Sequence, residues 1–522
     1  MPVLLPSRRA FSQVLLVTAV VVTGSLLSAC TGSSGGGGAS GSASTTPPDL
    51  SNVKIDLSNN AETIDPVGNG NLADNRMVAL LQGRMFVFSA GSATKTEPSL
   101  ATKATSSDGG KTWTIDLKSG LTFSDGSPLT SADVKSSVER LRTTKNFSAS
   151  DAVNIADVQT PTPTQVIFTL KGADSDFTQT LAMPTFSIVP QAAAADPKYF
   201  DKTPLYSGPF VLQGDWKSTS FVVVRNDKFG GAKPAVQKIS FTITSDPVSA
   251  VSRLQAGNID VATDIPMENV SRLSGDVTGL SVSSLASMYL LPNNRAGKLF
   301  ADVRIRQAIG YAIDRSAMAK LAFGETAKPQ LGPYPVVASY PGGVVWSDKP
   351  DMDKAKQLLQ GTACATECSF AATYFATESA TAGRVATALA QELKPLNITV
   401  QPKPVETGTF IDNSISGNFE MNIATSAGFN VPTTFTGAFD QASGCIYTGC
   451  SNAEWDPAVA ALLSASDQSA LEAASTKVTD IFAAWQPILP VSGSTWLYGE
   501  KRNLVGVISI EPNGLFWFSA AK

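Results

Sequence analysis

Cysteine is the residue type with the clearest chemical potential in this chain, and its spacing divides the five cysteines into three groups. Cys30 stands alone near the N-terminus, whereas Cys364 and Cys368 form one close pair and Cys445 and Cys450 form another. Two close pairs of thiols can form disulfide bonds in an oxidising compartment or bind zinc as four thiolates. These spacings are loose for a zinc site, so we expect disulfides and no metal, although four cysteines allow three pairings.

Histidine is absent from all 522 residues, which removes the most common general base and metal ligand. A Ser-His-Asp triad and histidine-ligated zinc, built from this chain's own side chains, are therefore excluded. Chemistry based on lysine or carboxylates stays open, but neither a G-x-S-x-G motif nor a carboxylate-pair motif is found. We expect a protein that is not an enzyme and needs no cofactor, with a secreted hydrolase as the weakest alternative.

The composition is that of a folded protein, with 43% hydrophobic and 8% aromatic residues. Forty basic residues stand against 44 acidic ones, which gives a net charge of −4 and no general attraction for nucleic acid. The length is sufficient for about three domains of ordinary size.

The N-terminus has the pattern of an export signal. Arg8 and Arg9 precede an apolar run at residues 14–27, and the sequence LSAC then ends at Cys30. Basic, apolar and small residues in this order are typical of a signal peptide, here residues 1–29. LSAC also resembles the bacterial lipobox, whose cysteine carries a lipid. We therefore expect an extracytoplasmic protein, anchored through Cys30 to the outer face of the cell membrane.

Residues 30–52 are rich in glycine and serine, which favours a flexible tether between the lipidated cysteine and the folded body. The export route stays open. SRRAF, residues 7–11, resembles a twin-arginine signal, and the general secretory route is an equal alternative.

Beyond the tether, short apolar strands alternate with amphipathic helices. WTIDL, residues 113–117, alternates with period two as a half-buried strand does. A turn at Asp125-Gly126 follows, and then a helix that Thr130 caps with Asp133 as its capping-box acid. This alternation predicts α/β layers with mainly parallel sheets. Further strands are expected at 166–170, 221–227 and 239–244, with helices at 247–257 and 302–325 and a helix feeding a strand within 384–402.

Eight segments resemble, in family order, the large solute-binding proteins of ABC importers, family 5, the group that contains oligopeptide-, dipeptide- and nickel-binding proteins. The resemblance implies that Arg304, Arg306 and Asp314 hold the fold together rather than bind a solute. The segments are ETIDP (62–66), FSDGSPLTSADVKSSVERL (123–141), SGPF (207–210), VRNDKF (224–229), GNIDV (257–261), DVRIRQAIGYAIDRSAMAK (302–320), DMDKAKQLL (351–359) and SNAEWDPAV (451–459).

The resemblance implies a two-lobed periplasmic-binding-protein fold, type II and similar to cluster C, with an extra subdomain on lobe I. Crossing segments join the lobes near 289–293 and 487–493. Carried over to this chain, lobe I would be residues 53–86, 201–285 and 486–522, the extra subdomain 87–200, and lobe II 286–485.

The function implied is that of a monomeric receptor, which closes around a peptide and delivers it to an ABC permease and its ATPase. Family peptide binders pair with the backbone of an extended peptide as if adding a strand. A sensor or adhesin with the same fold stays open as an alternative, because the sequence does not distinguish them.

The resemblance places the pocket wall in three segments, 59–62, 288–294 and 425–435. For Tyr289 and Phe429 a pocket role and core packing have equal weight, whereas core packing is favoured for Phe435 and Trp496. Asn60 and Asn293 fit ligand binding and turn formation equally. The complete set of candidate ligand-binding residues is Asn60, Ala61, Glu62, Tyr289, Asn293, Gly428, Phe429, Asn430, Phe435 and Trp496.

Gly428 departs from the family pattern. Family peptide binders carry an aspartate in a pattern like A-D-Y-N-x-P-T-S-F, where it pairs with the peptide ammonium, but this chain reads AGFNVPTTF. Burying an ammonium without a partner costs several kcal/mol. Either another acid takes over, or the ligand lacks a free ammonium there, as in an N-blocked or cyclic peptide, a peptide in another register, an oligosaccharide or an opine-like solute. The candidate acids are Glu62, Asp412, Glu420 and Asp440.

Restoring the acid with Gly428→Asp should strengthen the binding of simple free-amine peptides. Titration calorimetry measures this directly, and an unchanged affinity would contradict either the alignment at this position or the role assigned to Gly428.

Overall fold

The computed structural model describes residues 47–68, 72–144, 147–196, 198–202, 204–270, 272–337, 340, 342–378, 380–426, 448–465 and 467–521. All of them belong to one compact unit, residues 43–522. Within these ranges, no helix combines the length and the apolar character needed to cross a membrane.

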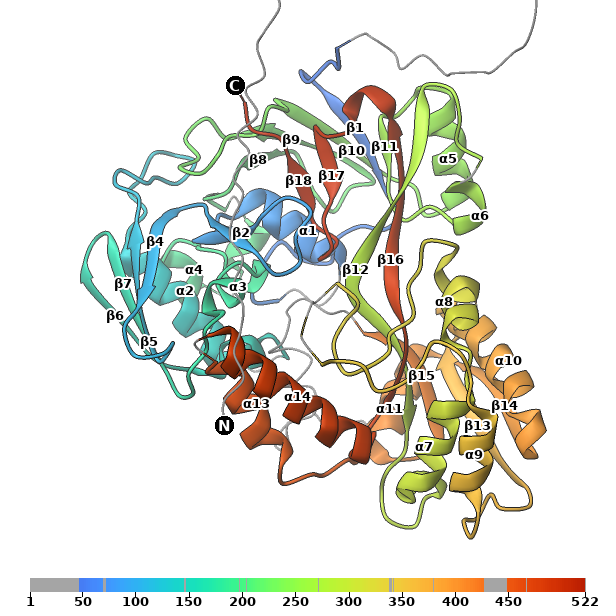
Figure 1. The fold of residues 1–522 in the computed structure, drawn as a ribbon. Coiled ribbons are helices and arrows are strands. Elements are labelled where there is room, and N and C mark those ends of the chain that lie inside the picture. Colours follow the sequence, from blue (N-terminus) through green and yellow to red (C-terminus); the bar gives the residue numbers. More distant parts are fainter. Residues whose placement is uncertain are drawn as a thin grey trace, which may run out of the picture. The chain divides into compact units, whose positions relative to one another are not determined.

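A ten-stranded sheet is the largest element among the described residues, in the order β14-β13-β15-β12-β16-β11-β1-β10-β9-β8 (Figure 1). We call β11, β1, β10, β9 and β8 the β1 half, and β14, β13 and β15 the β13 half. The strands are β1 (Val53–Leu57), β8 (Phe210–Gln213), β9 (Ser220–Arg225), β10 (Lys238–Ile243), β11 (Val261–Ala262), β12 (Val277–Pro292), β13 (Cys368–Phe375), β14 (Ile398–Val405), β15 (Met421–Ser426) and β16 (Leu489–Lys501).

The sheet is mixed, so the expectation of mainly parallel sheets was wrong. Strand β1 is parallel to β10 and β11, and β13 is parallel to β14 and β15, but the other neighbouring pairs are antiparallel. Alternation of strands and helices predicts parallel pairs within each half, and it carries no information on the long strands that join the halves.

Strands β12 and β16 connect the two halves of the sheet and lie side by side (Figure 1). Their first paired stretch joins Val277–Ser283 to residues 495–501, and their second joins Ser287–Leu290 to residues 489–493. The register shifts between Ser283 and Ser287. The regular ladder is thus interrupted where the two strands pass from one half to the other.

A four-stranded antiparallel sheet, β4-β5-β7-β6, packs with helix α2 (Ser131–Thr143). The expected turn is present, because Gly126 has a φ of +97° and its N–H donates to Phe123 O at 2.9 Å. The expected cap is also confirmed: the Asp133 carboxylate accepts from Thr130 N at 2.9 Å. These strands are β4 (Ala101–Ser106), β5 (Thr112–Leu117), β6 (Ile155–Thr162) and β7 (Gln165–Leu170).

The single helix expected at 302–325 is two helices, α7 (Val303–Ala312) and α8 (Arg315–Phe323). The chain is extended at Ile313, and the Asp314 carboxylate then accepts from Ala317 N at 2.8 Å as a new N-cap. Helix α8 ends at Gly324, which has a φ of +88°. The apolar stripe continues through both helices, so periodicity alone did not indicate the break.

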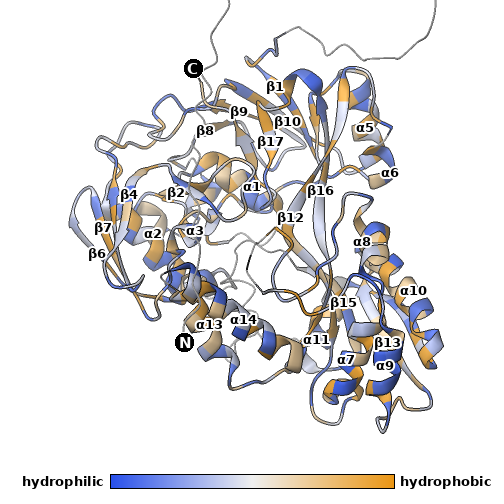
Figure 2. Cartoon of the chain, viewed as in Figure 1, coloured by the Kyte–Doolittle hydropathy of each residue, from blue (hydrophilic) through white to orange (hydrophobic). Residues whose placement is uncertain are grey.

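Helices α9 and α10 carry both hydrophilic and hydrophobic residues, as the expected amphipathic pattern requires, whereas α1 is buried along almost its whole length (Figure 2). The remaining helices are α1 (Leu72–Leu81), α3 (Phe177–Thr180), α4 (Ala192–Ala195), α5 (Pro247–Gln255), α6 (Met267–Val270), α9 (Met352–Leu359), α10 (Ala382–Glu392), α11 (Thr407–Ser416), α13 (Trp455–Leu463) and α14 (Gln468–Trp485). Two short hairpins complete the fold, with β2 (Phe86–Phe88) and β3 (Thr96–Pro98) in one and β17 (Ile508–Ile510) and β18 (Phe516–Phe518) in the other.

Buried apolar side chains form three large clusters. One packs the β1 half and includes Ile55, Phe241 and Tyr498. A second packs the four-stranded sheet against α2. The third runs from Met288 to Val491 in the chain and packs the β13 half against its helices. Strands β12 and β16 contribute to the first and third clusters.

Candidate functional site

The carboxyl ends of the parallel strands in the two halves face each other. Strand β11 is antiparallel to β16, with Val261 opposite Glu500 and Ala262 opposite Gly499, so its carboxyl end points along β16 toward the β13 half. Strand β15 is antiparallel to β12, with Ser426 opposite Ser287, so its carboxyl end points back toward the β1 half. Ligands of α/β sheets bind beside the carboxyl ends of strands. The space between these two edges is the candidate site.

At the edge of the β1 half, a buried ion pair holds the loops that follow β1 and β11. The side chain of Arg76 is 2% exposed and donates to Asp264 Oδ2 at 2.9 Å and to Gly514 O at 2.9 Å. Ser58 Oγ donates to the same carboxylate at 2.8 Å. Burial raises the pKa of Asp264, but the charge of Arg76 and these hydrogen bonds outweigh it and keep the pKa below its usual value. This carboxylate already has a cationic partner.

At the edge of the β13 half, Glu378 is an acid that has no cationic partner among the described residues. It follows β13 in a short 3-10 helix, Ala376–Glu378, and its carboxylate accepts a hydrogen bond from Thr425 N near the end of β15. Its Oε2 is buried and has no hydrogen-bond partner among the described residues. Burial raises the pKa of Glu378 to about 6, although the hydrogen bond from Thr425 acts in the opposite direction.

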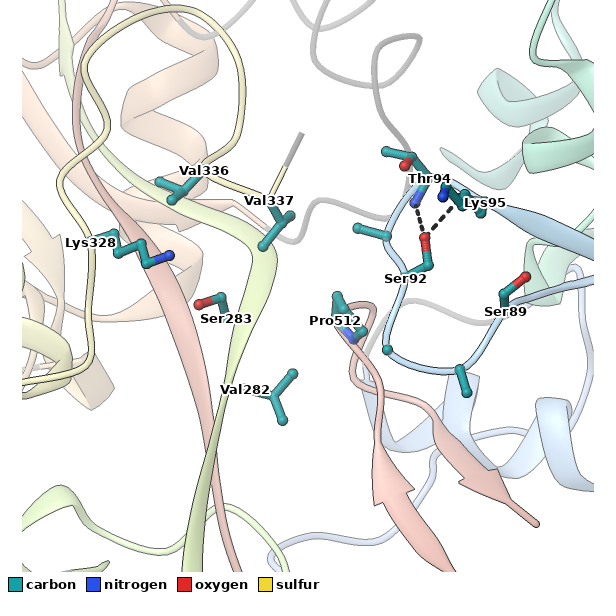
Figure 3. A pocket seen from close by; sticks show the side chains of 13 residues that line it. Ser89, Ser92, Thr94, Lys95, Val282, Ser283, Lys328, Val336, Val337 and Pro512 are labelled. Atoms are coloured by element: carbon teal, nitrogen blue, oxygen red, sulfur yellow. Dashed lines mark hydrogen bonds between the residues drawn. The ribbon is translucent and has the colours of Figure 1, made fainter. Parts of the chain in front are cut away.

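A cavity of about 530 Å³ lies beside the interruption in β12 and β16 (Figure 3). This volume is in the range of small-molecule pockets, about 300–1,000 Å³. Its lining comes from the β2–β3 loop, from Val282 and Ser283 of β12, from Pro512 and from the segment after α8. Figure 3 shows the side chain of Lys328 pointing toward Ser283. The charged residues of the lining are Lys95 and Lys328.

The turn between β17 and β18 connects this cavity to the long strands. Pro512 O accepts from Leu285 N of β12 and from Trp496 Nε1 of β16, both at 3.0 Å. One residue earlier, the Glu511 carboxylate accepts from Gly91 N of the β2–β3 loop at 2.6 Å. The turn therefore fixes one wall of the cavity to the interrupted part of the long strands.

The structure brings together only part of the expected site. Asn60, Ala61 and Glu62 lie just after β1, at the edge of the β1 half. Asn60 Oδ1 accepts from Ala61 N at 3.0 Å, Ala61 is buried in the core, and Glu62 is exposed. Trp496 donates to Pro512 beside the cavity, as described above.

Tyr289 and Asn293 lie in the β13 half. Tyr289 is buried in the third apolar cluster. Asn293 is fully buried and its amide donates to Gly417 O at 3.0 Å and to Phe419 O at 2.8 Å, while its Oδ1 accepts from Arg295 N. Both the nitrogen and the oxygen of the Asn293 side-chain amide are therefore hydrogen-bonded to other groups of the protein.

Several expected residues lie outside the described residues, and nothing in the structure bears on their role. They are Cys30, Gly428, Phe429, Asn430, Phe435, Asp440 and Cys445. Disulfides were expected with their pairing left open. Cys364 is bonded to Cys368 with an S–S distance of 2.04 Å, and Cys450 is also disulfide-bonded.

Sequence reasoning missed Glu378 and Lys328. No strand was expected at 368–375, so nothing in the sequence analysis placed Glu378 three residues beyond a strand end at the edge where the parallel strands meet. For Lys328 the segment after α8 carries no pattern that indicates a cavity wall.

Comparison with known proteins agrees with this geometry. Residues 95–444 match the family model of bacterial extracellular solute-binding proteins, family 5. The glutathione-binding protein GsiB of Escherichia coli K12 is 30% identical over 370 residues, which cover 68% of this chain and 70% of GsiB.

Solved structures share the fold across most of the chain. The binding protein DppA from Helicobacter pylori, in complex with the peptide STSA, is 18% identical with a TM-score of 0.73, covering 90% of this chain and 98% of DppA. The binding protein AgaA from A. tumefaciens R10, in complex with agropinic acid, is 20% identical with a TM-score of 0.73, covering 90% and 99%.

The expected α/β fold of the periplasmic binding proteins is therefore confirmed. Proteins of this family are solute-binding receptors of ABC importers that act outside the cytoplasm, and they are not enzymes. The chain belongs to the bacterial extracellular solute-binding proteins of family 5.

Proposed function

We propose that the protein is a lipid-anchored receptor that binds a peptide between two lobes and delivers it to an ABC permease. The observation that carries the proposal is the pair of strand edges that face each other and are joined by β12 and β16. A solute that contacts both edges links the two halves, and hinge closure around a ligand uses this arrangement.

The proposed lobes are residues 53–86, 201–285 and 486–522 for lobe I, 87–200 for its extra subdomain, and 286–485 for lobe II. The three apolar clusters support this division in outline, because most members of each cluster belong to one proposed unit. The clusters also cross its borders: Phe86 and Phe229 of lobe I pack in the second cluster, and Phe200 of the extra subdomain packs in the first. The solute would contact Asn60 and Glu62 of proposed lobe I and Lys328 of proposed lobe II. The segment that contains Gly428 and Phe429 remains a proposed wall on the strength of the family resemblance.

A peptide is the favoured solute. GsiB is named for glutathione, and the DppA structure holds a peptide. The cavity is lined by serine and threonine hydroxyls and two lysines together with alanine, valine and proline side chains, which suits a solute that has both a carboxylate and apolar groups. An opine-like solute is the second candidate, because the AgaA structure holds agropinic acid.

Native mass spectrometry of the full-length protein, purified from its own host, tests this proposal. We expect a non-covalently bound peptide that leaves the protein chemically unchanged. A bound oligosaccharide or opine-like molecule would contradict the peptide assignment, and peptides that are cleaved during incubation would contradict the receptor function.

The lipid anchor is tested separately by labelling cells with a radioactive fatty acid. We propose that the label enters the wild-type protein and that Cys30→Ser abolishes it. Equal labelling of both would show that Cys30 is not the lipidated residue.

A further inference from the structure

Glu378 has the position and the chemistry of a ligand group that the family resemblance did not indicate. We propose that Glu378 binds the cationic group of the solute, an ammonium in the case of a peptide. This inference rests on the proposed function, because it names a contact made by a solute between the two edges.

The location of Glu378 follows from the sheet. Strands β13 and β15 are parallel, with Ala372 beside Met421 and Tyr374 beside Ile423, so they end at the same edge. Glu378 lies three residues beyond the end of β13 and accepts a hydrogen bond from Thr425 N. This is the edge of the β13 half that faces the β1 half.

The electrostatics of Glu378 favour a cationic ligand. One carboxylate oxygen accepts from Thr425 N, and Oε2 is buried without a partner in the described part of the chain. No ion pair joins Glu378 to a described lysine or arginine. A buried carboxylate without a counter-charge is costly, and acids held in this state concentrate at functional sites. A solute ammonium would supply both the missing charge and a donor for Oε2.

The other acids considered from the sequence fit this role less well. Glu420 lies just before β15, at the opposite end of the strand from Thr425. At 3.3 Å per residue, the two residues are about 17 Å apart. Glu420 also pairs with Lys298 at 3.5 Å. Asp412 on α11 and Glu62 after β1 are exposed, so water already solvates them. Asp264 is neutralised by Arg76. Among the described candidates, Glu378 is therefore the buried acid whose negative charge is not balanced by a cation.

The same position explains how this chain can differ from family peptide binders. The sequence pattern of those proteins has an aspartate at the position where this chain has Gly428. Glu378 would supply the negative charge from the end of β13 instead, so a free-amine peptide would remain an acceptable solute.

Competition binding with paired peptide pools tests the inference. An equimolar pool of tripeptides with neutral side chains is offered to the full-length protein in free-amine and N-acetylated forms, and mass spectrometry identifies the members that co-elute with it. We expect the wild type to enrich free-amine members. Glu378→Gln should weaken their binding by at least about tenfold and leave the acetylated members unchanged.

The control is Glu367→Gln, which removes the same charge from an exposed residue just before β13, at the opposite end of that strand. It should bind as the wild type does. A pH titration adds a second readout, because wild-type affinity for free-amine members should fall as the pH drops below about 6, whereas the affinity of Glu378→Gln should not change.

The outcomes separate the inference from the proposed function. Equal uptake of both pools by the wild type, or unchanged selectivity in Glu378→Gln, contradicts the inference and leaves the receptor proposal standing. No uptake of either pool contradicts the peptide receptor itself. Because the glutamine is isosteric, an unchanged melting temperature of Glu378→Gln would show that any loss of binding is not a loss of folding.

Discussion

At the residue scale, buried arginines bind backbone carbonyls and thereby join separate segments of the chain. Arg306 donates to Phe300 O at 2.5 Å, to Trp485 O at 2.6 Å and to Gln486 O at 2.9 Å. It therefore connects α7 to the end of α14, just before β16 begins. This supports the expectation that Arg306 holds the fold together.

Removing this guanidinium should be strongly destabilising. Arg306→Met leaves three buried carbonyl groups without their donors, and each such group costs about 1–3 kcal/mol. We expect a loss of about 3 kcal/mol or more in the free energy of unfolding, measured by urea denaturation. Arg304→Met, which removes an exposed arginine paired with Asp302, is the control and should cost less than about 1 kcal/mol. Equal losses in the two variants would contradict the argument.

Lys328 carries a second prediction at this scale. It lines the cavity, is exposed and forms no ion pair with any described residue, so a solute carboxylate can approach it. Lys328→Gln should weaken the binding of peptides with a free C-terminus by roughly twofold to fivefold and leave the amidated forms unaffected. Calorimetry with Lys403→Gln as the control checks this, since Lys403 is an exposed residue of β14 outside the cavity lining. If Lys403→Gln weakened the binding of these peptides to the same extent, net charge alone would explain the effect of Lys328→Gln.

At the scale of elements, features set by residues close in sequence could be predicted, whereas features set by contacts between distant segments could not. The turn at Gly126 and the cap at Thr130 depend on residue types within a few positions, and the structure confirms both. The division of 302–325 into α7 and α8 depends on Asp314, which caps α8, although the apolar stripe is continuous.

The candidate site shows the same limit. Residues after β1 were expected because a family pattern marks them, but Glu378 and Lys328 reach the site through strand pairing and loop packing. A glutamate after a strand usually indicates a solvated turn. Only the pairing of β13 with β15 shows that this one lies beside Thr425.

A contact between the proposed extra subdomain and proposed lobe II provides a prediction at this scale. Ser175 N, in the loop between β7 and α3, donates to Leu463 O at the end of α13 at 2.8 Å. If solute binding holds the halves together, hydrogen exchange of the Ser175 amide should slow when peptide is added. The neighbouring Asp174 amide donates to Gly110 O at 3.1 Å within its own unit and should not change. Equal rates at Ser175 with and without peptide would contradict a contact controlled by the solute.

At the scale of the whole molecule, stability depends on an acid buried within the ten-stranded sheet. Glu500 in β16 is fully buried, neither of its carboxylate oxygens has a hydrogen-bond partner among the described residues, and burial raises its pKa from 4.5 to about 8. Between these values the unfolded chain releases this proton and the folded chain keeps it. Stability should therefore fall as the pH rises from about 4.5 to about 8, by up to about 1.4 kcal/mol per pH unit.

Glu500→Gln should remove this part of the pH dependence. Melting temperatures measured by calorimetry should be similar for the two proteins at pH 5 and higher for the variant at pH 8, because the amide has no proton to lose. If the difference in melting temperature between the wild type and Glu500→Gln were the same at pH 8 as at pH 5, the assigned role of Glu500 would be contradicted.

The two halves of the molecule are joined by β12 and β16, and both the site and the proposed motion depend on these strands. Small-angle X-ray scattering of the full-length protein, with and without a saturating amount of its bound peptide, tests this most directly. Closure around a solute held between the two strand edges predicts a smaller radius of gyration with peptide. An identical scattering profile at confirmed saturation would contradict a receptor that closes around its solute.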